Sequence, residues 1–346
     1  MDDYQHSPAG EGFFLPGEWE PHARTWIQWP TRADAWHDRM PSVYAQVAEI
    51  ARLIGGYEPV SILVRPEDEA QARFACGRDN NIEFVVLPID DCWARDTAPL
   101  YVTNGVDRIG GVAWQFNGWG NRVHGYAGDA ALAGRLLAQQ KLKCFSADMV
   151  LEGGAVSTDG FGTLLVTEDN LLGEDRNPEL SQGEIEERLA LFLGVRKIIW
   201  MGGGLSADSA GGHVSKVAVF CAPGKVLTAF ATDERSLDRL TLEDNEAHLL
   251  AAKDASGEAL EIVRVPLPKL PKKGLRGEEL ALSYLDYCVL NEAVLVPAFG
   301  DEMDGMAASV IASAFPGRKL VQVDVSVLAL GGGALRRLTQ FEPALK

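Results

Sequence analysis

The sequence lacks any uninterrupted hydrophobic run of about 18 residues, the length that crosses a membrane as a helix. Its first residues, MDDYQHSPAGEGFF, are acidic and polar, whereas a secretory signal has a basic segment followed by an apolar one. We therefore expect no membrane partner and a cytoplasmic location.

Cysteine is scarce and scattered, and no CxxC pair is present. This excludes both a disulfide framework and a zinc-finger type of site. The chain also has no GxxxxGK[ST] phosphate loop and no GxGxxG dinucleotide fingerprint. We expect the protein to require neither a metal nor an organic cofactor. We expect most of the cysteines to be reduced and at least half-buried. They are Cys76, Cys92, Cys144, Cys221 and Cys288.

Basic residues are in the minority. There are 32 lysines and arginines against 49 aspartates and glutamates, which gives a net charge of -17. Because nucleic-acid binding depends on basic side chains that displace counterions, this balance excludes nucleic acid as a partner. The acidity is compatible with a cationic ligand, but a solvated acidic surface produces the same composition.

Short hydrophobic segments rich in β-branched residues recur along the chain, and stretches with helical spacing separate many of them. Hydrophobic residues make up 47% of the 346 positions, which is ample for a core. Because no Ser/Gly/Pro-rich linker interrupts the chain, we expect a single α/β domain over residues 1–346. This pattern alone favours a doubly wound sheet. The expected strands are 59–64, 82–87, 109–116, 162–167, 197–201, 216–220, 225–230, 261–265, 293–297 and 319–325.

Four segments have the spacing of amphipathic helices, and two of them carry start signals. Ser181 followed by Glu184 predicts a capping box, and Asp301 with Asp304 places acids at another helix N-terminus. The expected helices are 43–54, 130–140, 184–193 and 306–315.

The segment Asp90–Thr97, DDCWARDT, follows an expected strand, at the kind of position where functional groups are often found. Asp96 could pair with a guanidinium while Trp93 offers its aromatic face to the same cation. An ordinary Arg–Asp salt bridge in a turn, made by Arg95, explains the composition equally well.

Other candidate residues stand beside glycine clusters. Glu152 precedes Gly153–Gly154, so it either accepts bonds from turn amides or serves a buried site. His213 stands between Gly211–Gly212 and an expected strand, and is either structural or catalytic. Trp119 lies in the loop FNGWG, which either walls a pocket or forms a packed turn.

Taken in order, these segments and several others resemble the agmatine deiminase family, which includes bacterial peptidyl-arginine deiminases. The ordered set spans nearly the whole chain and is specific although each piece is short. The resemblance implies a pentein fold, a five-bladed α/β propeller in which five ββαβ-like units surround a pseudo-fivefold axis and a central site. The matching segments are 16–22, 93–97, 116–120, 152–154, 176–178, 212–214, 296–301, 315–318 and 330–333.

The resemblance also implies a chemistry. In the family a cysteine thiolate attacks the guanidinium carbon, ammonia leaves, and water hydrolyses the covalent intermediate. Carried over by position, Asp96 binds the guanidinium, His213 moves protons and Glu152 orients His213. The ligand is then a small guanidino compound such as agmatine or arginine, in polyamine metabolism, and a homo-oligomer is left open. The substrate-binding candidates are Trp93, Arg95, Trp119, Ser215, Arg336 and Arg337.

Two positions depart from the family pattern. The family usually has GGGNIHC before a Thr-Gln pair, where this chain has GGGALRR, so Arg337 stands at the nucleophile position. The family usually has DGHVD where this chain has GGHVS, so Ser215 stands in place of a second guanidinium-binding aspartate. Arginine has no nucleophilic lone pair because its pKa exceeds about 12. Both changes make the site more positive.

Three hypotheses follow, beside that of a working guanidine hydrolase. In the first, Arg337 or Arg336 fills the guanidinium position and pairs with Asp96 and Glu152. The pocket is then plugged, or takes an anionic or zwitterionic ligand. In the second, His213 and Glu152 act as an acid/base pair without a covalent step, or Cys92 substitutes as nucleophile. In the third, the chain is a non-catalytic binding or regulatory protein.

Overall fold

The strands form five separate sheets in a computed structural model that describes residues 6–78, 81–269, 272–275 and 277–345. The doubly wound sheet expected from the pattern alone is therefore wrong. The sheets, in their spatial order, are β16 (Thr339–Pro343), β1 (His22–Gln28), β2 (Val60–Val64) and β3 (Ile82–Val86); β4 (Leu100–Thr103), β5 (Ile109–Gln115) and β6 (Lys143–Val150); β7 (Ser157–Thr158), β8 (Thr163–Thr167) and β9 (Lys197–Met201); β10 (Ala218–Ala222), β11 (Lys225–Phe230) and β12 (Glu261–Pro266); and β13 (Cys288–Val289), β14 (Ala293–Ala298) and β15 (Lys319–Asp324).

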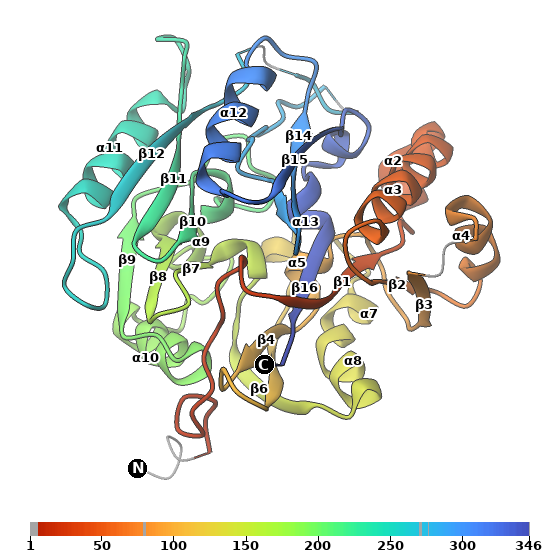
Figure 1. Ribbon diagram of the computed structural model, residues 1–346, viewed down its shortest axis with the longest axis horizontal. Helices are drawn as coiled ribbons and strands as arrows, with labels where there is room; N and C mark the ends of the chain where they lie inside the picture. The colour runs from red at the N-terminus through yellow and green to blue at the C-terminus, as the bar shows by residue number, and fades with distance from the viewer. Residues whose placement is uncertain (1–5, 79–80, 270–271, 276, 346) are drawn as a thin grey trace.

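Each sheet repeats one pairing pattern. An antiparallel pair comes first, as in β4 with β5, and the second strand then pairs in parallel with a third, as β5 does with β6. The same order holds in the other three-stranded sheets. In the fifth, the C-terminal strand β16 pairs antiparallel with β1, which pairs in parallel with β2. The ends of the chain thus join within one sheet, and Figure 1 shows the five units around a common centre.

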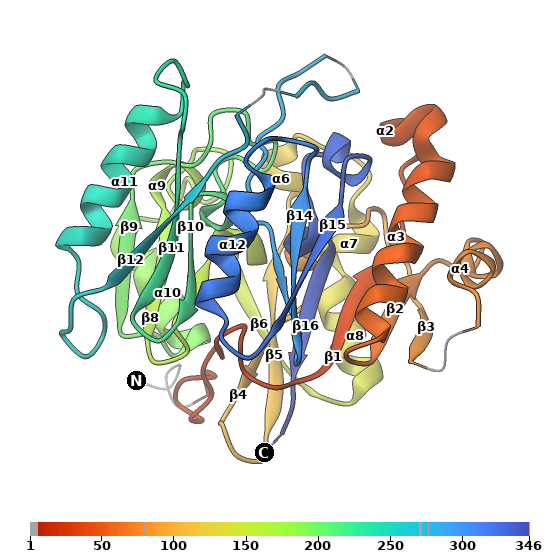
Figure 2. The same ribbon diagram turned by 45° about the horizontal axis from the view of Figure 1, so that its top comes forward.

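Parallel strands need a crossover connection, and a long helix supplies it in each unit. Figures 1 and 2 show α3, α11 and α12 beside the strands of their own units, on the outside of the ring. The five crossover helices are α3 (Met40–Gly55), α8 (Leu132–Gln140), α10 (Gln182–Leu193), α11 (Arg239–Ala251) and α12 (Asp304–Ala314). The shorter elements are α2 (Ala33–Trp36), η1 (His37–Arg39), α4 (Glu69–Cys76), α5 (Ala94–Thr97), α6 (Gly118–Asn121), α7 (Ala127–Ala130), η2 (Gly153–Ala155), α9 (Glu168–Leu171), η3 (Val214–Lys216), η4 (Leu328–Gly331) and α13 (Leu335–Leu338).

The expected elements are largely confirmed. Each of the ten expected strands overlaps an observed one, and the four expected helices correspond to α3, α8, α10 and α12. In α3 the buried positions Val43, Val47, Ile50 and Ile54 follow the three- and four-residue spacing of one helix face. Full burial of each such side chain contributes about 1.5–3 kcal/mol. Four of the five cysteines are buried, and all five are free thiols.

The turn that precedes the first strand of each unit faces the centre of the ring. Asp96 precedes β4, Glu152 precedes β7 and His213 precedes β10. Asp286 precedes β13, and Arg337 precedes β16. The short helices at four of these turns pack against one another, α13 on α5, α5 on η2, and η2 on η3. The repeated fold therefore brings five distant segments together.

The capping box of α10 is present as predicted. The Ser181 side chain accepts a bond from the Glu184 backbone N–H, and the Glu184 carboxylate accepts from the Ser181 N–H. We expect Ser181→Ala to lower the free energy of unfolding by about 1 kcal/mol, because one orphan helix donor loses its partner. Chemical denaturation measures this. Ser309→Ala within α12 is the control and should change stability by less than about 0.5 kcal/mol. Equal effects would contradict the capping role.

Candidate active site

Arg337 lies at the centre of the ring with its guanidinium between two tryptophans. Its Cζ atom is 4.8 Å from the centroid of the Trp93 ring and 4.8 Å from that of Trp119. Its Nε donates to Asp96 Oδ2 over 2.8 Å. A guanidinium is planar and weakly hydrated, so it stacks on aromatic rings more readily than an ammonium does. The arrangement is a cation-binding cage filled by the chain's own side chain.

Asp96 is fully engaged by groups that favour its ionised form. Trp119 Nε1 donates to Oδ2 over 2.9 Å, and the Gly154 N–H donates to Oδ1 over 3.3 Å. Burial opposes ionisation, but the charges of His213 and Arg337 and the Trp119 bond outweigh it and lower the pKa of Asp96. Asp96 is thus an anion that is already paired.

Asp286 fixes the position of Arg337 by capping the short helix α13. Its carboxylate accepts the Ala334 N–H over 2.8 Å and the Arg337 N–H over 3.0 Å. Gly333 lets the loop approach both partners, since an added Cβ would lie 2.5 Å from the Trp93 ring and 2.6 Å from Arg337 Cδ. Although burial alone would lower the pKa of Arg337, the charges of Asp96 and Asp208 raise it.

His213 and Glu152 lie next to the Arg337–Asp96 pair and are almost fully buried. His213 Nδ1 is 3.9 Å from Asp96 Oδ1, and His213 Nε2 is 3.5 Å from Glu152 Oε2. One hypothesis expected Glu152 to pair with Arg337, but the two side chains do not pair. Instead Arg176 Nε lies 2.9 Å from one Glu152 oxygen and 3.2 Å from the other. The structure therefore places the three predicted catalytic side chains together and adds Arg176 to them.

Asp208 is a further buried carboxylate that the sequence did not single out. It accepts the backbone N–H of Gly212 over 3.1 Å and that of His213 over 2.8 Å, which fixes the turn that carries His213. Burial is outweighed by the charges of Lys216 and His213, so the pKa of Asp208 is strongly lowered. Lys216 Nζ lies 3.6 Å from Asp208 and donates to the Gly332 carbonyl over 2.8 Å.

A cavity of about 940 Å³ opens above this group. Arg337 and the rims of Trp93 and Trp119 form part of its lining, as do Asp91 and Asp208. The predicted catalytic residues, Asp96, Glu152 and His213, are absent from the lining in the described part of the chain. The Arg337 side chain therefore stands between the cavity and the acid/base groups.

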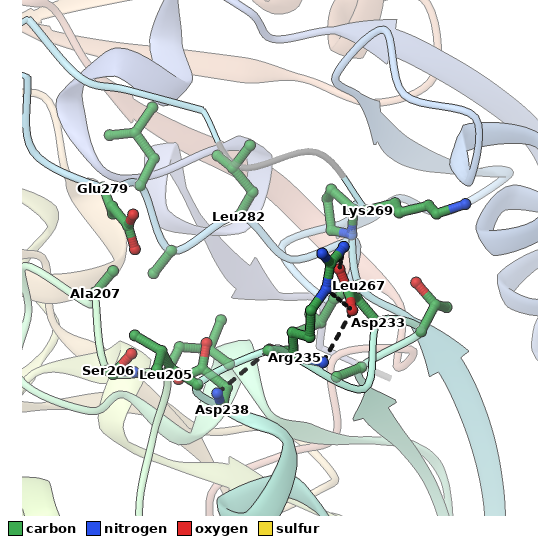
Figure 3. A pocket seen from close by; sticks show the side chains of 17 residues that line it. Leu205, Ser206, Ala207, Asp233, Arg235, Asp238, Leu267, Lys269, Glu279 and Leu282 are labelled. Atoms are coloured by element: carbon green, nitrogen blue, oxygen red, sulfur yellow. Dashed lines mark hydrogen bonds and ion pairs between the residues drawn. The ribbon is translucent and has the colours of Figure 1, made fainter.

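A smaller cavity of about 280 Å³ adjoins the first, and the two share the lining residues Ser206, Ala207, Leu237, Glu279, Leu280 and Ala281. Figure 3 shows the side chains that line this smaller cavity. Arg235 contacts Asp233, and the Asp238 carboxylate accepts the Ser206 N–H over 2.7 Å.

Arg95 and Arg336, expected to bind ligand, point elsewhere. Both contact the same Glu18 oxygen, Arg95 Nη1 at 3.1 Å and Arg336 Nη2 at 2.7 Å. Because consecutive side chains on a helix point about 100° apart, Arg336 and Arg337 leave α13 on different sides. Neither side chain lines the central cavity described above. Ser215 is buried in η3, and its hydroxyl makes no hydrogen bond to the other predicted residues in the described structure.

Cys92 does not have the surroundings of an activated nucleophile. It is fully buried, and burial together with the neighbouring Asp91 charge raises the pKa of its thiol far above the usual value. Reactive thiols need a lowered pKa and access to solvent. Within the described residues no cluster of His, Cys, Asp and Glu is suited to hold a metal ion, and no helix is long and apolar enough to span a membrane.

Comparison of the fold with solved structures first defines the class of protein. The chain superposes on the agmatine deiminase of Enterococcus faecalis with a TM-score of 0.92 at 32% identity, covering 97% of each chain. DDAH from Pseudomonas aeruginosa, at 12% identity and a TM-score of 0.52, shares the fold alone. The mixed α/β fold is therefore that of the pentein superfamily.

Sequence comparison then gives the family. Residues 14–343 match the model of the Porphyromonas-type peptidyl-arginine deiminases. The chain is 35% identical to the agmatine deiminase of Stutzerimonas stutzeri over 365 residues and 34% identical to that of Pseudomonas aeruginosa over 366. The alignments cover 99% of both chains in each case. The chain belongs to the agmatine deiminase and peptidyl-arginine deiminase family.

The buried pair of Arg337 and Asp96 predicts a strong energetic coupling. Asp96→Asn should lower the free energy of unfolding by about 3–5 kcal/mol, because it leaves the guanidinium buried without a counter-charge. Adding Arg337→Met to Asp96→Asn should recover part of the loss, because the unpaired charge is gone. Chemical denaturation of both single variants and the double variant measures the coupling.

The control for this cycle is an exposed pair of the same kind. Glu69 contacts Arg73 on the surface of α4, and Glu69→Gln should change stability by no more than about 0.5 kcal/mol. A loss from Asp96→Asn as small as that of Glu69→Gln would show that the Arg337 guanidinium does not depend on Asp96.

Proposed function

We propose that this chain is a family member whose guanidinium site is occupied by its own Arg337. In this state it binds a small ligand in the cavity above and does not carry out cysteine-dependent deimination. The observation that carries the proposal is the position of the guanidinium, between Trp93 and Trp119 and bonded to Asp96. A carboxylate and two aromatic faces are the groups that a guanidino ligand would itself require.

The residue at the nucleophile position supports the proposal. A covalent thioether needs a thiolate, and Arg337 supplies no nucleophilic electron pair. The raised pKa and full burial of Cys92 argue against its use as a replacement.

The charge balance favours a plugged site over an anion-binding one. Asp96 neutralises Arg337 at 2.8 Å, so the guanidinium presents little free charge to the cavity. A ligand there meets the edge of the cage, while His213 and Glu152 lie behind it.

A second candidate is a working guanidine deiminase, and the comparisons favour it. Relatives named agmatine deiminase align along nearly the whole chain. The motif resemblance assigns Asp96, Glu152 and His213 the catalytic positions of the family. This function requires Arg337 to leave the cage and a nucleophile other than a cysteine at that position. Water activated by His213 is the remaining candidate.

Removal of the Arg337 side chain tests the plug directly. Arg337→Ala leaves a hole shaped for a guanidinium, with Asp96 at its base. We expect guanidinium chloride to bind this variant with a Kd on the order of millimolar, because a ligand with only four non-hydrogen atoms makes few contacts. Wild type should not bind it, because the site is filled. Isothermal titration measures binding, and a rise in thermal stability reports the linked stabilisation.

Two variants control this experiment. Arg337→Met fills the hole with an uncharged chain and should fold without binding guanidinium. Arg337→Ala combined with Asp96→Asn keeps the hole but lacks the anion, and should also fail to bind. Equal binding by wild type and Arg337→Ala, measured against sodium chloride at the same ionic strength, would refute the plug.

A further inference from the structure

The carboxylate of Asp91 is a buried group in the wall of the central cavity. Asp91 is 8% exposed and lines the cavity beside Trp93. One oxygen accepts the Cys92 N–H over 2.8 Å. Among the described residues, no lysine, arginine or histidine lies within salt-bridge distance of the carboxylate. The chain therefore supplies this acid with a cap but with no counter-ion.

The arginines that share the cavity bond to other acids. Arg32 binds Asp34 through two bonds, of 2.8 and 2.7 Å. Arg122 Nη2 lies 3.3 Å from an oxygen of Asp175. Arg337 is held by Asp96, as described above. None of these cations is committed to Asp91.

Other acids of the cavity wall have partners in the chain. Lys216 lies 3.6 Å from Asp208, and Lys273 lies 3.0 Å from Glu279. Asp91 differs from these acids because it is buried and has no cation within salt-bridge distance. Burial raises its pKa even though the Cys92 N–H and the charges of Arg32 and Arg337 act in the opposite direction. A buried carboxylate without a cation at salt-bridge distance is costly, so a cation from solution would stabilise it.

The backbone on both sides of Asp91 is held firmly. Gln28 Nε2 donates to the Asp91 carbonyl over 3.0 Å, and the Thr31 hydroxyl contacts the Asp90 carbonyl. These bonds come from β1 and the segment that follows it, so the carboxylate does not depend on a free loop for its position. Such preorganisation lowers the entropic cost of binding.

We propose that Asp91 binds the ammonium group of an aliphatic amine that enters the cavity above Arg337. The alkyl part of the amine would lie along the apolar side chains of the wall. These include Val123, Leu237, Leu275, Leu280 and Leu330. The inference rests on the proposed function, because the cage of Asp96 is filled by Arg337 and Asp91 is then the carboxylate left for a cation.

The chemistry of the site favours an ammonium over other cations. A compact ammonium with three donors suits a carboxylate that already accepts the Cys92 N–H on one oxygen, whereas a guanidinium gains most from a two-oxygen contact. A metal ion needs several ligands, and the described residues include no cluster of three or more His, Cys, Asp and Glu suited to hold one.

Titration of the protein with 1-butylamine tests this inference, with 1-butanol as the uncharged ligand of the same shape. Asp91→Asn keeps the oxygen that caps the Cys92 N–H but removes the negative charge. We expect wild type to bind butylammonium saturably and Asp91→Asn to bind it at least about tenfold more weakly, the effect of a charged hydrogen bond. Isothermal titration at neutral pH measures both affinities.

The matched control is Glu279→Gln, since Glu279 lines the same cavity but is already paired with Lys273. Its affinity for butylammonium should equal that of wild type. Equal binding by Asp91→Asn, equal binding of 1-butanol, or full competition by potassium chloride at the same concentration would each overturn the inference. Thermal unfolding verifies that both variants are folded.

The outcome is separable from that of the proposed function. If Arg337→Ala binds guanidinium but butylammonium does not depend on Asp91, only the amine site is wrong. If butylammonium binding depends on Asp91 but Arg337→Ala does not bind guanidinium, the plug is wrong.

Discussion

The interaction on which the centre of this protein depends is the buried pair between Arg337 and Asp96, 241 positions apart in the chain. A buried guanidinium must have a counter-charge, because its transfer out of water is otherwise prohibitive. Asp96 supplies that charge, and the two tryptophan rings, each 4.8 Å away, offer a favourable electrostatic surface. Asp96 and the two tryptophans thus give the Arg337 guanidinium the contacts that they could equally give to a cationic ligand.

The ring of five units makes this pair geometrically possible. The pairing of β16 with β1 closes the ring and brings the C-terminal segment against the turn before β4. Asp286, from the turn before β13, then caps α13 and sets the direction of the Arg337 side chain. The same cap sends Arg336 to Glu18, on another side of the short helix. One carboxylate therefore separates two adjacent arginines into different environments.

Local sequence signals predicted elements well where one physical cause dominates. Continuous apolar runs such as 163–167 are buried on both faces, and Ser181 with Glu184 forms a cap within one turn. Strands β1 and β6 were missed because polar residues interrupt their hydrophobic pattern, as in KCFSADMV. Helix α11 was missed because only Leu242, Asn245 and Leu249 are buried along its length. The five-unit architecture came from the resemblance, since pairing between distant strands leaves little local trace.

At the site, the sequence predicted residue types better than their partners. Asp96, Glu152 and His213 were identified from their motifs, but Arg176 was cited only as part of a matching segment. Asp208 and Asp286 were not predicted, because their roles consist of bonds to backbone N–H groups that form only in the folded chain. The directions of Arg95 and Arg336 depended on the position of Glu18, far away in sequence.

The most direct measurement of the central claim is the release of ammonia from agmatine by the purified full-length chain. With Arg337 in the cage and no thiolate at that position, we predict no release above a protein-free blank. The same assay with arginine and with a peptidyl-arginine substrate should give the same result. Turnover of any of these substrates that is abolished by His213→Ala would contradict the account, because it would show that the site is open and catalytic.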